Sequence, residues 1–98
     1  MNMQQMLMQA QKLQREMQKQ QAELEQKEFT INKNGAVVVV VKGDKTIKSI
    51  SVDEDAFEKE NKEMVEESIA LAINEAIEKI KSEEEAIQSK VAGAGKLF

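Results

Sequence analysis

A run of five consecutive valines, residues 37–41, most constrains how this 98-residue chain can fold. β-Branched side chains lose rotamer freedom in a helix and pack well on a pleated sheet, so the run predicts a β-strand. Because its apolar residues do not alternate with polar ones, we expect a central strand that is covered on both faces.

Turn signals on either side of the valines predict two neighbouring strands. Asn34-Gly35 favours a tight hairpin turn, since both residues tolerate positive φ, and residues 42–45 contain a second turn signal. Residues 29–52 are therefore expected to form a three-stranded antiparallel meander. In the third strand, Ile47 is out of phase with Ile50, which predicts either a bulge or burial on both faces.

The sequence on both sides of this sheet has a helical period. Residues 2–28 contain no Gly or Pro and are rich in good helix formers, with apolar residues spaced as in a heptad repeat. Residues 53–91 are predicted to be helical, with Asp55 and Glu58 as a capping pair near the start, and residues 92–98 form a flexible tail. The chain is thus predicted to be one α+β domain of order α-β-β-β-α.

A chain with so few large apolar side chains can build only a small core, and it needs a further source of stability. It has three Phe and no Trp, Tyr or Cys, so neither a large aromatic core nor a disulfide is available, and oligomerisation is the remaining remedy. We therefore predict a homodimer, and leave open whether the heptad seam packs between chains or within one chain. The predicted interface consists of the seam residues and one central-strand valine: Met3, Met6, Ala10, Leu13, Met17, Gln20, Leu24 and Val39.

The net charge of −4 hides an uneven distribution. Residues 53–98 carry six Lys against thirteen acidic residues, whereas residues 29–52 carry four Lys against one Asp. In the first helix Lys12, Arg15 and Lys19 fall on the face opposite the heptad seam, as an outward basic ridge that could neutralise DNA phosphates. A solvated helix face is the plainer interpretation of three charges. Two turn residues, Lys42 and Lys45, are further candidates for DNA contact.

The sequence offers little material for catalysis. The chain has no His and no Cys, which removes the imidazole base, the thiolate nucleophile and the usual zinc ligands. The acidic residues of 53–60 do not fit a calcium loop, because Phe57 and Glu58 stand where an oxygen ligand and a glycine are needed. We expect no enzyme, cofactor, metal or small-molecule substrate. With no apolar run of membrane-spanning length and no secretory signal at the start, we expect a cytoplasmic protein and no membrane partner.

Several stretches carry a resemblance to a known family. They are Met-Leu-Met-Gln-Ala-Gln-Lys-Leu-Gln at 6–14, the valine run, Ile-Ser-Val-Asp at 50–53, and the blocks at 61–67 and 70–76. Over nearly its whole length the chain resembles the YbaB/EbfC nucleoid-associated proteins of bacteria. The resemblance implies a homodimer that binds double-stranded DNA, alters its shape and helps to organise the nucleoid. The chain lacks the Gly-rich lead and the Pro-containing tail common in that family, and no individual DNA contact is carried over.

Two other functions fit the same pattern. Helix–hairpin–helix order also occurs in prefoldin-type chaperones, so a protein-binding module or small chaperone-like dimer that uses the first helix is the main alternative. That helix would be about 40 Å long at 1.5 Å per residue, which is short for a chaperone arm. A purely structural dimer is the third hypothesis.

Overall fold

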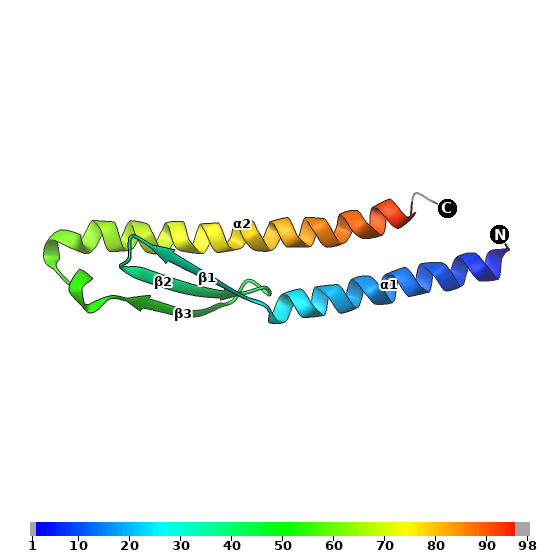
Figure 1. The fold of residues 1–98 in the computed structure, drawn as a ribbon, viewed down its shortest axis with the longest axis horizontal. Helices are drawn as coiled ribbons and strands as arrows, with labels where there is room; N and C mark the ends of the chain where they lie inside the picture. The colour runs from blue at the N-terminus through cyan, green and yellow to red at the C-terminus, as the bar shows by residue number, and fades with distance from the viewer. Residues whose placement is uncertain (1, 96–98) are drawn as a thin grey trace.

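The computed structural model describes residues 2–95 and confirms the predicted α+β class and element order. A helix, three strands, two short 3-10 turns and a second helix follow one another, and the two helices run along each other in opposite directions beyond one end of the sheet (Figure 1). The elements are α1 (Met3–Gln26), β1 (Glu28–Lys33), β2 (Val37–Lys42), β3 (Ile47–Val52), η1 (Glu54–Ala56), η2 (Lys59–Asn61) and α2 (Lys62–Gly95).

The three strands form an antiparallel sheet of order β1-β2-β3, so the valine strand is central as predicted. Asn34 and Gly35 both have positive φ, 56° and 63°, as expected from the turn signal. The out-of-phase Ile47 is explained by an irregularity in β3: Val40 pairs with Ser49, whereas Val41 pairs with Ile47. Of the two predicted possibilities the bulge is therefore the one observed.

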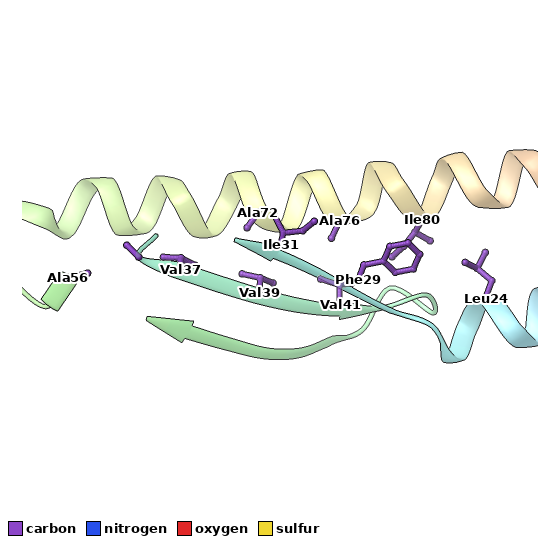
Figure 2. Packing of buried hydrophobic residues seen from close by; sticks show 11 residues of the cluster. Leu24, Phe29, Ile31, Val37, Val39, Val41, Ala56, Ala72, Ala76 and Ile80 are labelled. Carbon is purple, nitrogen blue, oxygen red and sulfur yellow. The ribbon is translucent and has the colours of Figure 1, made fainter. Parts of the chain in front are cut away.

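The core lies between the sheet and α2 (Figure 2). One face of β2 is fully covered, since Val37, Val39 and Val41 are 0% exposed. Ala72 and Ala76 of α2 face this sheet, and their small side chains allow the helix backbone to approach closely. Phe29 and Ile31 of β1 and Ile80 of α2 complete the central part of the cluster.

The opposite face of β2 does not match the prediction. Val38 and Val40 are only half-buried, because α2 covers one face of the sheet and no other described element covers the second. The expectation of burial on both faces is thus met on one face only. A continuous run of valines gives the strand two apolar faces, and a single chain covers only one of them.

The connection between β3 and α2 differs in detail from the prediction. The capping residue of η1 is Asp53, whose side chain accepts a hydrogen bond from the Asp55 N–H at 2.9 Å, so the predicted Asp55 cap is wrong by two positions. At its other end α2 continues to Gly95, four residues past the predicted end, because extending an existing helix avoids the cost of nucleation, which outweighs the poor helix propensity of the two glycines among residues 92–95. The rest of the predicted tail, residues 96–98, lies outside the described residues. Within the described part of the chain no helix is long and apolar enough to cross a membrane.

Candidate nucleic-acid interface

The helix that carries the predicted basic ridge is attached to the rest of the chain near its C-terminal end. Leu24 is buried, and Leu13, Met17 and Gln20 on the same face of α1 are half-buried. Gln20 and Leu24 share a hollow of about 310 Å³ with Ala86 and Ile87 of α2. The C-terminal half of the heptad seam therefore packs against α2 within one chain.

The N-terminal half of the seam remains uncovered. Met3 is 77% exposed and Met6 is 49% exposed, and Ala10 is also exposed. By contrast, Leu24 is 6% exposed and Val39 0% exposed in their own chain, so a partner could add little burial to Leu24 and none to Val39. The candidate interface residues of the seam are thus reduced to those that are exposed or half-buried. Whether a second copy covers them stays a prediction.

The three ridge residues of α1 are exposed and face away from α2. Lys12, Arg15 and Lys19 are spaced by three and four residues, so neighbouring members are about 5–6 Å apart at Cβ. They follow the face opposite the buried Leu24, since a helix turns about 100° per residue. The Arg15 Nε–H donates to the carbonyl oxygen of Gln11 at 3.4 Å. The residues predicted to form a ridge therefore do share one solvent-facing surface.

None of the three ridge residues forms an ion pair within the described part of the chain. The ion pairs found there involve other lysines: Lys27, Lys33, Lys45, Lys48 and Lys62. Around Arg15 the surface is formed by glutamine amides, since Gln11, Gln14 and Gln18 line a shallow hollow with it. Amides can donate hydrogen bonds to an anion without repelling it, so the immediate surroundings of Arg15 suit a negatively charged ligand, whereas Glu16 and Glu23 lie one turn from Lys12 and Lys19 at the border of the ridge.

The two turn lysines are placed differently from the ridge. Lys42 is half-buried at the end of β2. Lys45, in the β2–β3 turn with φ of 70°, lies 3.1 Å from a carboxylate oxygen of Glu84 on α2. Glu84 neutralises the charge of Lys45 locally. Lys45 therefore differs from the three ridge residues of α1, which have no ion-pair partner among the described residues.

The β2–β3 turn has an ordered carboxylate. The Thr46 backbone N–H and the Thr46 hydroxyl both donate to Oδ1 of Asp44. The side-chain and backbone hydrogen bonds from Thr46 lower the pKa of Asp44 below its ordinary value, and the nearby Lys42 charge lowers it further. The turn therefore keeps its conformation best with Asp44 ionised.

One residue of this region was not singled out by the sequence reasoning. Gly43 is buried, and its N–H donates to the Lys27 carbonyl at 2.8 Å. A β-carbon at Gly43 would lie 1.7 Å from the Leu24 carbonyl oxygen. The sequence marks Gly43 only as a turn residue, because the approach of α1 to this turn is a tertiary contact.

The fold and the basic ridge define a small helix–sheet–helix protein with a free cationic helix face, a class suited to binding an anionic polymer. Residues 1–95 match the model of the YbaB/EbfC DNA-binding family, and the chain belongs to that family. This is a family of nucleoid-associated DNA-binding proteins and not an enzyme class.

Several curated relatives are similar to the chain over most of their length. A nucleoid-associated protein of Mycoplasmopsis pulmonis is 38% identical over 97 residues, covering 99% of this chain and 95% of the relative. A nucleoid-associated protein of Malacoplasma penetrans is 41% identical over 87 residues, covering 89% and 93%. One from Enterococcus faecalis is 39% identical over 90 residues, covering 91% and 86%. The resemblance found in the sequence is thereby confirmed.

Proposed function

We propose that the chain binds double-stranded DNA in the bacterial nucleoid as a homodimer and alters the shape of the DNA. The contacts are made mainly to phosphates by Lys12, Arg15 and Lys19, one set from each α1. The observation that carries this proposal is the ridge itself, three exposed cations on one helix face without ion-pair partners among the described residues.

The dimensions of the ridge suit a DNA backbone. Lys12 and Lys19 are separated by about 10 Å along the helix axis, and one DNA strand presents a phosphate about every 3.4 Å along the duplex axis. One α1 can thus follow roughly three phosphates, and two copies about six. Residues 3–26 contain no aromatic side chain that could stack on a base, so phosphate contacts dominate and sequence specificity is low.

The acidic remainder of the chain does not prevent this binding. Three carboxylates of α2 are engaged by lysines of other elements, in the pairs Lys27–Glu83, Lys33–Glu75 and Lys45–Glu84. Those pairs hold the acids against the body of the molecule. We assign Lys42 and Lys45 a minor share of the DNA contact, since Lys45 would have to leave Glu84 to reach a phosphate.

The dimer is supported by apolar residues that a single chain leaves uncovered around β3. On this edge strand Ile47 and Ile50 are 48% and 45% exposed, because α2 runs along β1 and β2 (Figure 1). Val38 and Val40 on the outer face of β2 are half-buried. Ile50 pairs with Val39 and Ile47 with Val41, so both isoleucines lie on the α2 side of the sheet, and a second copy packed beside α2 over β3 would cover them and enlarge the small core. Met3, Met6 and Ala10 extend the apolar surface available to the partner.

The DNA contact is tested with a charge reversal and a matched control. The triple variant Lys12→Glu, Arg15→Glu, Lys19→Glu is compared with Lys79→Glu, Lys81→Glu, Lys90→Glu, which makes the same change of charge on exposed residues of α2. With six phosphate contacts, the wild-type log–log dependence of affinity on salt should have a slope of about −5. We expect the α1 triple to lose duplex binding at 50 mM salt and the α2 triple to retain most of it. Equal losses in the two triples would contradict the assignment to α1.

The dimer is tested by the mass in solution. Ile50→Asp places a charge in the proposed interface, and Asn74→Asp, at an exposed position of α2 away from β3, is the control. Light scattering should give twice the 11.0 kDa chain mass for wild type and for the control, and a lower mass for Ile50→Asp. An unchanged mass for a folded Ile50→Asp would place the interface elsewhere.

A further inference from the structure

We infer that Gly43 is a positioning residue, which sets the direction in which α1 leaves the sheet and thereby aligns the basic ridge. The DNA part of this inference rests on the proposed function. The part that concerns the direction of α1 stands on the contacts of the chain alone.

The contact between Gly43 and α1 is made by backbone on both sides. The Gly43 N–H donates to the carbonyl of Lys27, the residue that ends α1, at 2.8 Å. A β-carbon on Gly43 would lie 1.7 Å from the carbonyl oxygen of Leu24 and 2.6 Å from its carbon. Backbone atoms cannot turn aside as a flexible side chain can. Any side chain at this position therefore has to displace the last turn of α1.

Two further contacts fix the same end of the helix. The Leu24 side chain is buried against the core, and Glu83 of α2 pairs with Lys27, the C-cap of α1. The neighbouring Glu84 pairs with Lys45 and so holds the β2–β3 turn, which contains Gly43, against α2. Towards the N-terminus the residues of α1 become exposed on all sides. The C-terminal half of the helix is thus held, and the N-terminal half projects from it (Figure 1).

This arrangement makes the ridge sensitive to a small change at Gly43. Relief of the overlap needs a movement of about 1.5 Å, from 1.7 Å to roughly ordinary contact distance. Leu24 lies about 4.5 Å from Lys27 along the helix axis and Arg15 about 18 Å from it, at 1.5 Å per residue. If α1 turns about Lys27 as a rigid body and gives up its packing against α2 at Leu13 and Met17, the movement at Arg15 is about four times larger, roughly 6 Å. That exceeds the rise of about 3.4 Å between successive phosphates on one strand.

The test measures the position of α1 directly. The chain contains no Cys, so Gln4→Cys on α1 and Gln88→Cys on α2 provide a unique pair of spin-label sites. Labelled chains are diluted with unlabelled ones, so that pulsed electron paramagnetic resonance reports distances within one chain. Gly43→Ala is compared with Gly35→Ala in the other hairpin turn, where a β-carbon has no atom within 4 Å but the φ of 63° strains an alanine, so that this control includes a local loss of stability without an overlap with α1. We expect a shifted or broadened distance distribution for Gly43→Ala and the wild-type distribution for Gly35→Ala.

An unchanged distribution in folded Gly43→Ala would overturn the inference. Should that variant be unfolded in plain buffer, the distance is measured in buffer with sucrose, which favours the folded state and does not remove the overlap at Gly43. A wild-type distribution in the refolded variant would equally overturn the inference.

The DNA readout separates positioning from simple loss of stability. At salt and temperature where both glycine variants are folded dimers, we expect the salt slope of Gly43→Ala to fall to about half of wild type, as two misaligned ridges cannot engage one duplex together. Gly35→Ala should retain the full slope. A full slope in Gly43→Ala despite a changed distance would refute the link to DNA binding. Failure of wild type to bind DNA would refute the proposed function, and the distance measurement would still decide the role of Gly43.

Discussion

Val39 and Val40 form a matched pair that tests how the core is built. They are adjacent, chemically identical residues of β2, and they point to opposite faces of the sheet. Val39 is fully buried under α2, whereas Val40 is half-buried on the face that no described element covers. Truncation of each to Ala removes the same two methyl groups. Any difference in the effect on stability therefore reports the surroundings of the two side chains.

The burial of the two side chains gives the expected magnitudes. Two buried methyl groups contribute about 1.6 kcal/mol by transfer from water, and the cavity left under α2 raises the cost of Val39→Ala to about 2–3 kcal/mol. For Val40→Ala in a single chain we expect about 1 kcal/mol or less. At a urea slope of about 1.5 kcal/mol/M, the larger loss lowers the unfolding midpoint by about 1–2 M.

The measurement is urea denaturation of wild type and both variants at two protein concentrations, with unfolding monitored by circular dichroism. If a second copy covers the outer face, the cost of Val40→Ala should grow at the higher concentration, at which the dimer is populated. Equal costs for the two variants at low concentration would refute the one-sided core. A cost of Val40→Ala that does not depend on concentration would argue against a partner over this face.

Two smaller predictions concern hydrogen bonds. Because donation from Thr46 lowers the pKa of Asp44, this carboxylate contributes stability above the ordinary Asp pKa, and the contribution is lost as the pH falls through the lowered value. Asp44→Asn should thus destabilise the fold at neutral pH and approach wild type in acid; parallel stability curves across the acid range would contradict this. The buried Ser68 hydroxyl accepts from Asn34 Nδ2 at 2.7 Å, so Ser68→Ala should cost about 1 kcal/mol and lower the Tm by about 4–8 °C. An unchanged Tm in a thermal scan would show that solvent replaces the bond.

Features set by local sequence were predicted correctly. The valine run, the Asn34-Gly35 turn and the heptad period each depend on residues close together in the chain, and the strands and helices lie where those patterns indicate. The ends of the helices were less predictable. Propagation of α2 through the Ala and Gly residues to Gly95 depends on the stability of the helix before it, which a local pattern does not report.

Features that depend on tertiary contacts were not predictable in the same way. The heptad pattern identifies the buried face of α1, but it cannot tell whether α2 or a second copy covers that face. The outward position of Lys12 and Lys19 follows from the same pattern and was predicted. The pairing of Lys45 with Glu84, 39 residues further along the chain, and the contact of Gly43 with Leu24 arise only when the β2–β3 turn meets both helices.

The most direct test of DNA binding through α1 is a titration of the ¹⁵N-labelled chain with a short DNA duplex, monitored by nuclear magnetic resonance. We expect the largest changes of amide chemical shift at residues 8–22, centred on Arg15, with changes that diminish as salt is added. The acidic segment of residues 53–67 should be nearly unaffected. Changes concentrated in that segment or along α2, with α1 unperturbed, would contradict the proposed DNA interface.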